Sequence, residues 1–471
     1  MKDGIQRPRS ATRRAIALLS LLLAIGCSSP AEPPKPKKKN VILITLDALR
    51  QDHLSTFGYT RQTSPNIDWL ALNGVAFRTV VTTGCAPRVS MTSLFTSKPF
   101  SWAQLQNGTN LSESSTTIAE AFAAAGYQTA GFIASPILAR ETGFAQGFEK
   151  YVDFGDGPAD YVTADIAVQA AIDHLKARAA DAPPFFLYVS LVEPHPPWRH
   201  ASPWLTSAES SNSFFDQTCT YIPSGDEIAL LGNDQRDHLI AKYDGALRFA
   251  DEQIGNLIKQ LRTSGQLNNT TIAVTTDYGL ELLDRFSVSH DYNPFDEVVR
   301  IPLVIFDQTT SFKDAIPKAV QARIFDVGPT LMGLADVAVP ADAEGIDLLK
   351  RAQDVPELAF VHCADADVVR SLEYKLIHFD LTPIRQRVRQ MPEGLEDGVK
   401  LFNLRSDPRE ELDARGSGGE QLQKMESALA SFRSSLDREP LRLAESGASI
   451  EPKTRERLRV LGYDAPVAGG G

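Results

Sequence analysis

The feature that most constrains the fold of this chain is a series of short apolar runs that have the pattern of strands buried on both faces. The first run covers residues 40–46 and is followed at once by Asp47. Strands of this kind are typical of parallel sheets, because the crossover connections place helices over both surfaces. Four further runs follow at residues 127–134, 184–192, 270–276 and 301–306.

Segments of helical length lie between these runs, for example at residues 117–125 and 243–261. Alternating strand and helix segments predict an α/β sandwich around a mainly parallel sheet. The pattern changes after about residue 340, where short strand-like runs are followed by charged helical segments. These short runs are at residues 358–363, 368–379 and 400–403. We therefore divide the body into a large domain at residues 40–340 and a small α+β subdomain at residues 341–471.

The N-terminal region has the order of a targeting sequence. Arg13 and Arg14 precede an apolar segment at residues 15–25, and Gly26 and Cys27 follow. A basic stretch, a short apolar segment and small residues before a cysteine resemble a bacterial lipoprotein signal, cleaved before a lipid-modified Cys27. Residues 1–26 are then the signal peptide, and the Pro- and Lys-rich residues 27–39 are an extended tether. An uncleaved N-terminal anchor helix is the alternative. The prediction is a protein of the cell envelope held to the membrane at Cys27.

The charge of the chain restricts the classes of molecule that it can bind. The formal net charge is −11 although the first 39 residues are strongly basic, so the body is more acidic than the total suggests. An acidic body argues against non-specific nucleic-acid binding, which needs positive charge to neutralise phosphates. An anionic substrate would have to be held by a local cationic pocket.

Two aspartates stand at the ends of predicted buried strands. Asp47 follows the run at residues 40–46, and Asp277 follows the run at residues 270–276. Since the carboxyl ends of parallel strands meet at one edge of a sheet, we expect the two carboxylates to lie close together there. Alternatively, Asp47 and Asp277 cap turns, because turn-capping residues also stand directly after the ends of strands.

Several segments, taken in order along the body, resemble the sulfatase family of the alkaline-phosphatase-like superfamily. They are Asn40-Val-Ile-Leu-Ile-Thr-Leu-Asp-Ala-Leu-Arg, Glu193-Pro-His-Pro-Pro-Trp, Tyr243-Asp-Gly-Ala-Leu-Arg-Phe-Ala-Asp, Thr276-Asp-Tyr-Gly, Asp296-Glu-Val-Val-Arg-Ile-Pro, Leu401-Phe-Asn-Leu-Arg-Ser-Asp-Pro and Arg455-Glu-Arg-Leu-Arg-Val-Leu-Gly-Tyr. The resemblance covers nearly the whole body. It implies an α/β/α sandwich and hydrolysis of sulfuric esters, with a sulfate-ester or glycan substrate.

The resemblance also implies roles for particular residues. Asp47 and Asp277 match metal-site positions of the family, where a divalent cation, calcium in the first instance, would be held. His195 and His290 match histidines that contact the sulfate or its leaving oxygen. Cys85 is similar to the cysteine that the family converts to formylglycine, and Arg88 to its arginine partner.

The chain departs from the family pattern at the metal site. Tyr278 follows Asp277, where the family has His or Asn. A protonated phenol is a poor ligand for a hard cation. We expect the Tyr278 hydroxyl to donate a hydrogen bond to a carboxylate instead, which would hold the pocket together without a metal.

The nucleophile segment departs as well. The family pattern is Cys/Ser-x-Pro-x-Arg, but here Arg88 comes one residue too early after Cys85, whereas Pro87 fits. The family also has a Thr-Gly about nine residues after the nucleophile, and counting back from Thr96 places Pro87 at the nucleophile position, which cannot work because proline has no nucleophilic side-chain atom. A buried or disulfide-bonded Cys85 is therefore the alternative to a catalytic Cys85. Cys219 and Cys363 are the other cysteines of the body, and the sequence does not say which of the three pair.

These observations leave three functional hypotheses. The first is an exported sulfuric-ester hydrolase whose activity on aryl sulfates is very low or absent. The second is a non-catalytic relative that binds sulfated or phosphorylated glycans. The third is a phosphoester hydrolase or transferase with a hydroxyl nucleophile, for which Ser90 and Thr92 are near enough in sequence.

Overall fold

Eight strands form the large sheet of the protein, in the order β10-β2-β9-β8-β1-β7-β5-β6. Their bounds are β1 Asn40–Leu46, β2 Val75–Val81, β5 Gln128–Ile133, β6 Lys150–Val152, β7 Phe185–Leu191, β8 Thr270–Thr275, β9 Arg300–Phe306 and β10 Ala322–Arg323. β1 lies between β7 and β8 and is parallel to both, whereas β9 runs antiparallel to β8 and β2. The predicted mainly parallel sheet is confirmed.

The structure is a computed structural model, and it describes the body of the chain with some gaps. The described residues are Met1 and residues 38–101, 104–106, 110–155, 161–200, 202–205, 233–285, 288–290, 293–312, 320–382, 397–436, 451–461 and 463. The predicted signal peptide, Cys27 and the tether as far as residue 37 lie outside the described residues, as does Cys219. In the part of the chain that is described, no helix is long and apolar enough to cross a membrane.

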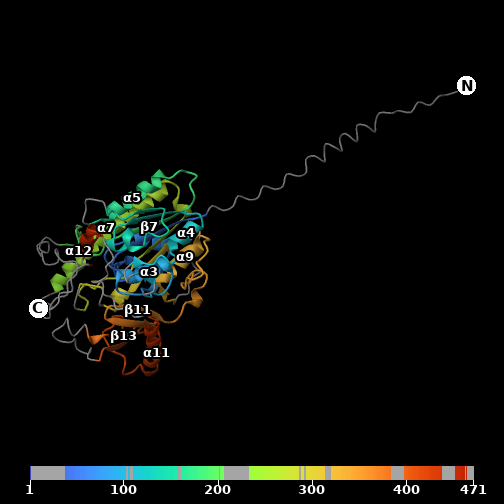
Figure 1. The fold of residues 1–471 in the computed structure, drawn as a ribbon. Coiled ribbons are helices and arrows are strands. Elements are labelled where there is room, and N and C mark those ends of the chain that lie inside the picture. The colour runs from blue at the N-terminus through green and yellow to red at the C-terminus, as the bar shows by residue number, and fades with distance from the viewer. Residues whose placement is uncertain are drawn as a thin grey trace. The chain divides into compact units, whose positions relative to one another are not determined.

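Both faces of the large sheet are covered by helices, as the apolar runs predict. Successive side chains of β1 point to opposite faces, so Ile42 and Ile44 join one buried cluster and Val41 and Leu43 join another. The first cluster includes residues of α2 (Pro65–Leu72), α5 (Ala164–Ala177) and α7 (Asn233–Thr263). The second includes residues of α3 (Pro87–Thr96), α4 (Ile118–Ala124) and α9 (Val327–Leu334). Figure 1 shows α5 and α7 on one side of β7, with α4 and α9 on the other.

The predicted helices are present with shifted ends. The segment predicted at residues 117–125 is α4, which begins after Thr117 because the Thr117 and Glu120 side chains each accept a hydrogen bond from the other's backbone N–H. The segment predicted at residues 243–261 is the C-terminal part of the longer α7.

The small subdomain is an antiparallel sheet covered by a helix. Its strands are β11 (Ala359–Cys363), β12 (Ala366–Arg370), β13 (Tyr374–Phe379) and β14 (Val399–Asn403), paired in that order, and α11 (Gly419–Ser435) packs against them. The prediction of one strand at residues 368–379 is wrong. A turn at Ser371, whose N–H donates to Tyr374 O at 2.8 Å, divides this segment into β12 and β13.

A buried ion network joins the small sheet to the large domain. Asp296, at the start of the short helix α8 (Asp296–Val299), accepts from Arg370 of β12 at 2.7 Å and from Lys375 of β13 at 3.1 Å. Lys375 also contacts Glu410 at 2.7 Å, and neither side chain is exposed. Burial raises the pKa of Glu410 to about 7, although the nearby Lys375 ammonium opposes that shift.

The substitution Glu410→Gln should reveal this raised pKa as a pH-dependent change in stability. The folded protein keeps the proton on Glu410 up to about pH 7, whereas the unfolded chain releases it near 4.5, so the contribution of Glu410 to stability falls as pH rises between these values. Relative to the parent, Glu410→Gln should therefore gain up to about 3 kcal/mol in unfolding free energy between pH 5 and pH 8. Urea unfolding at each pH measures the difference. The exposed neighbour Glu411→Gln is the control, and a pH-independent difference for Glu410→Gln would contradict the prediction.

Candidate functional site

Asp47 and Asp277 lie at the carboxyl edge of the large sheet, where β1 and the adjacent parallel strand β8 end. Both carboxylates line one small cavity of about 10 Å³, which is no larger than a single water molecule. Burial and the neighbouring charge of Asp47 raise the pKa of Asp277 well above its usual value. The structure therefore brings the two predicted carboxylates to one place, close enough to interact electrostatically.

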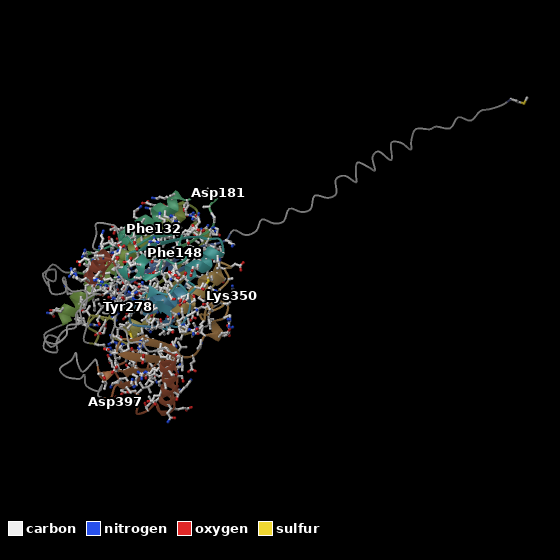
Figure 2. The ribbon with its side chains drawn as sticks, viewed as in Figure 1. Phe132, Phe148, Asp181, Tyr278, Lys350 and Asp397 are labelled. Atoms are coloured by element: carbon white, nitrogen blue, oxygen red, sulfur yellow. A yellow bond between two sulfur atoms is a disulfide. The ribbon has the colours of Figure 1, made fainter. Side chains whose placement is uncertain are left out.

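Both oxygens of Asp47 accept hydrogen bonds from tyrosines. The Tyr278 hydroxyl donates to Oδ1 at 2.8 Å, and the Tyr463 hydroxyl donates to Oδ2 at 2.8 Å. Tyr278, which is labelled in Figure 2, is fully buried. Burial and the charge of Asp47 raise the pKa of both phenols well above the usual value, so both stay protonated and remain donors near neutral pH. The hydroxyl of Tyr278 thus has the role expected from the sequence.

The predicted histidines lie around the same tyrosines. His195 follows β7, and its ring centroid is 5.7 Å from that of His290 and 5.1 Å from that of Tyr463. The His290 ring stacks on Tyr278 with 4.2 Å between centroids. Each histidine donates its Nδ1 proton to a backbone carbonyl, that of Pro196 for His195 and that of Cys85 for His290. Because a carbonyl oxygen can only accept, Nδ1 of each ring carries a proton.

Cys85 does not carry a thiol in this structure, because it forms a disulfide with Cys363 of β11. A disulfide sulfur is neither an attacking thiolate nor a substrate for conversion to formylglycine. The assignment of Cys85 as the nucleophile is therefore corrected, and the disulfide alternative describes the structure. Nearby, the His362 N–H donates to Thr83 O at 2.9 Å, so β11 runs beside the segment that precedes α3.

Pro87, the first residue of α3, is the member of the nucleophile segment that lines the cavity with Asp47 and Asp277. Arg88 is buried beside it, and burial lowers its pKa to about 10. Ser90 and Thr92 are buried within α3, and the Ser90 hydroxyl donates to Gly84 O at 2.9 Å. Among the described residues, the cavity lining includes neither of these hydroxyls, and the third hypothesis stays a prediction.

The residues at this edge do not fit a tightly held divalent cation. No group of three His, Cys, Asp or Glu side chains in the described ranges is arranged to hold a metal ion. Asp47 directs both of its oxygens at phenol hydroxyls, and the residue after Asp277 is a tyrosine. A calcium site normally takes six to eight oxygen ligands, of which this arrangement offers few.

Replacing Tyr278 should therefore change cation binding. We expect the parent to bind Ca²⁺ with a Kd no tighter than about 1 mM, the weak end of known protein sites. Tyr278→Asn releases Asp47 Oδ1 and adds an amide oxygen, so the affinity should rise at least about tenfold. Isothermal titration measures both. Tyr278→Phe, which releases Asp47 without adding a ligand, is the matched control. Binding of Ca²⁺ by the parent with a micromolar Kd would contradict the conclusion that these residues do not fit a divalent cation.

The sequence reasoning missed two participants in this site. Tyr463 was noticed only as part of a family-like tail, and its bond to Asp47 spans 416 residues. Cys363 was one of two candidate partners of Cys85 in the body, and it lies 278 residues from Cys85. The position of Pro87 had a signal in the sequence, because counting back from Thr96 places Pro87 at the nucleophile position.

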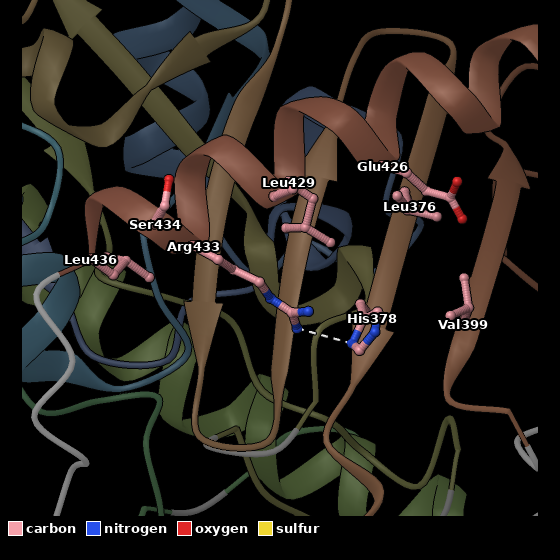
Figure 3. Close-up of a pocket in the computed structure, with 9 residues that line it drawn as sticks. Leu376, His378, Val399, Glu426, Leu429, Arg433, Ser434 and Leu436 are labelled. Carbon is pink, nitrogen blue, oxygen red and sulfur yellow. Dashed lines mark hydrogen bonds between the residues drawn. The ribbon is translucent and has the colours of Figure 1, made fainter.

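A larger cavity of about 460 Å³ lies in the small subdomain, between α11 and strands β13 and β14 (Figure 3). Arg433 of α11 reaches across it to His378 Nδ1 at 2.9 Å. The remaining lining is mostly apolar, with Leu376, Val399, Leu429 and Leu436. None of the predicted site residues lines this cavity, so the candidate site is the edge around Asp47.

Comparisons with known proteins agree with the resemblance noted in the sequence. A family model described as Sulfatase matches residues 39–337. An ulvan-active sulfatase of Formosa agariphila is 26% identical over 373 residues, covering 71% of this chain and 70% of the relative. An arylsulfatase of Clostridium perfringens is 22% identical over 383 residues, covering 66% of this chain and 78% of the relative.

Solved structures show the same fold. One, determined with its substrate D-glucosamine-2-N,6-O-disulfate, has a TM-score of 0.66 and 20% sequence identity, and the match covers 86% of this chain and 99% of that one. A phosphonate monoester hydrolase of Agrobacterium radiobacter has a TM-score of 0.63 and 18% identity, and the match covers 85% of this chain and 96% of that one.

Proposed function

The chain belongs to the sulfatase family of hydrolases, and from this premise we propose that the pocket around Asp47, His195 and His290 receives a sulfate ester of a glycan. Similar proteins support the substrate class, since they include an ulvan-active sulfatase and an N-acetylglucosamine-6-O-sulfatase of Bacteroides thetaiotaomicron. The acidic body does not attract an anionic ester by its overall field, so local cationic or neutral donors would have to hold it.

One observation carries this proposal. His195 and His290 come from different loops, yet their rings converge to 5.7 Å at the carboxyl edge of the sheet, which is where α/β sheets bind ligands. With Nδ1–H given to a backbone carbonyl, each ring donates to an anionic oxygen through Nε2–H when the ring is protonated. Arg88 lies buried in the adjoining helix and adds a positive charge to this side of the sheet.

A second candidate function is binding without hydrolysis, and the disulfide favours it. Hydrolysis by the family's chemistry needs a nucleophile at the ester and positive charge on its oxygens. In this chain the sulfur of Cys85 is bonded to Cys363, and the residue at the cavity is Pro87. We therefore propose that the protein binds sulfated or phosphorylated glycans and hydrolyses them very slowly.

Titration with D-glucosamine-2-N,6-O-disulfate tests the proposed pocket. His195→Ala and His290→Ala should each weaken its Kd by about tenfold or more, the loss expected for a hydrogen bond to a charged group. His378→Ala, in the cavity of the small subdomain, is the control and should leave Kd unchanged. Unsulfated glucosamine should not bind. Equal affinity for the sulfated and unsulfated sugars, or loss of binding in His378→Ala alone, would contradict a binding site at Asp47.

We also propose that the protein is anchored in the cell envelope by a lipid on Cys27. The basic-apolar-cysteine order of the N-terminal region supports this, and a disulfide is stable in an oxidising compartment outside the cytoplasm. Cys27→Ala should move the protein from the membrane fraction to the soluble fraction after cell lysis. Protein that stays with the membranes through an alkaline wash would contradict the anchor.

A further inference from the structure

The C-terminal segment of the described chain is fastened to the large domain beside the candidate site. Helix α12 (Pro452–Val460) buries Arg457, whose guanidinium donates to Ala134 O at 2.9 Å and to Asp153 O at 2.7 Å. Leu458 and Leu461 are also buried. The Tyr463 N–H donates to Leu458 O at 2.9 Å, so the backbone turns back toward the helix at this residue.

This turn directs Tyr463 into the site. Its ring centroid lies 5.1 Å from that of His195 and 6.0 Å from that of His290. Its hydroxyl lies 2.8 Å from Asp47 Oδ2 and 2.8 Å from the Tyr278 hydroxyl. The Tyr463 ring therefore lies against both histidine rings and its hydroxyl lies on Asp47, so this side chain occupies space beside the three residues that would bind an ester.

We propose that Asp47 is the docking point of the chain's own C-terminal segment, and that Tyr463 is a plug which must leave before a ligand reaches the two histidines. The first half rests on contacts in the structure alone. The second half rests on the proposed function, because it assumes that the pocket takes an anionic ester.

The chemistry of Asp47 supports a docking role. A carboxylate that accepts two phenol hydroxyls is satisfied without a cation, and such charge-assisted bonds are stronger than neutral ones. Both bonds to Asp47 are specific to hydroxyl donors, so a phenylalanine in place of Tyr463 would fill the space but lose the attachment. Tail docking and ligand entry then compete for the same volume, and each must weaken the other by the same factor.

Amide hydrogen exchange of residues 452–461 tests the docking. Tyr463→Phe should speed this exchange by about tenfold to a hundredfold, the loss of one hydrogen bond to a charged group. Tyr374→Phe, which removes a hydroxyl from the small sheet, is the matched control and should leave it unchanged. In an Asp47→Asn background Tyr463→Phe should have little further effect, because the two side chains act as a pair. The docking proposal is overturned if Tyr463→Phe speeds the exchange by less than about threefold. It is also overturned if Tyr463→Phe has its full effect both in the parent and in Asp47→Asn.

Binding of D-glucosamine-2-N,6-O-disulfate tests the plug. Tyr463→Ala, confirmed as folded by its thermal unfolding, should bind this sugar at least about tenfold more tightly than Tyr463→Phe, which keeps the ring. Saturating sugar should speed exchange of residues 452–461 in the parent by the same factor. Binding that leaves this exchange unchanged would overturn the plug. If no variant binds the sugar, the proposed function fails, while the exchange of Tyr463→Phe still decides the docking.

Discussion

The purified protein is expected to release 4-nitrophenol from its sulfate ester about a million times more slowly than a sulfatase with an intact nucleophile, the scale of loss when an enzyme's nucleophile is removed. The reason is local. Pro87 lines the cavity beside Asp47 and has no nucleophilic side-chain atom, and the sulfur of Cys85 is held in the disulfide with Cys363. The rate is measured by absorbance, with the arylsulfatase of Clostridium perfringens assayed under the same conditions.

Two controls distinguish this explanation from a protein that is inactive only because Cys85 was not converted to formylglycine or was oxidised. Co-expression with a formylglycine-generating enzyme should leave the mass of the peptide that contains Cys85 unchanged after reduction. Turnover should also stay low after reduction of the disulfide, because the free Cys85 still lies two residues before the position that lines the cavity. Turnover that is abolished by a chelator and by Cys85→Ala would contradict the prediction and restore Cys85 as the nucleophile.

The substitution Cys363→Ser is expected to lower the free energy of unfolding by about 2–5 kcal/mol, the usual cost of removing a native disulfide. The bond closes a long loop, since the two cysteines are 278 residues apart, and the unfolded chain gains the corresponding freedom when it is absent. Because the small subdomain also meets the large domain through Lys375 and Asp296, the variant should still fold.

Chemical unfolding with and without a reductant measures this effect. The parent should lose stability when reduced, whereas Cys363→Ser should be insensitive to the reductant. Cys219→Ser is the matched control and should behave like the parent. A parent whose unfolding is the same in both conditions would show that the bond between Cys85 and Cys363 is not formed in solution.

Much of the fold could be predicted because its signals are local. The run at residues 40–46 is confirmed without a shift as β1, since an unbroken apolar stretch bounded by Lys39 and Asp47 has few alternatives. The strands β2, β6 and β10 were missed. β6 and β10 are only 3 and 2 residues long, and β2 carries an exposed Arg78 that breaks the apolar pattern. Its residues form a strand because β9 and β10 flank them, which is a tertiary effect.

The residues of the candidate site also differ in whether the sequence carries a signal for their position. Asp47 and Asp277 could be brought together from the sequence because parallel strands collect their ends at one edge. Tyr463 and Cys363 could not, because their partners lie 416 and 278 residues away and no periodicity connects them. The hydroxyl of Tyr278 was predicted correctly as a donor to a carboxylate, since a buried phenol needs an acceptor and an aspartate was expected nearby.

The position of Pro87 has a consequence for how a nucleophile could be introduced into this site by engineering. The motif of the family would direct such an effort to Cys85, but the backbone places residue 87 beside Asp47 and Asp277. Proline at the first position of a helix can be replaced without losing a helical hydrogen bond. Pro87→Cys or Pro87→Ser would therefore set a heteroatom at the cavity in one mutational step, while the disulfide that holds the small subdomain stayed intact.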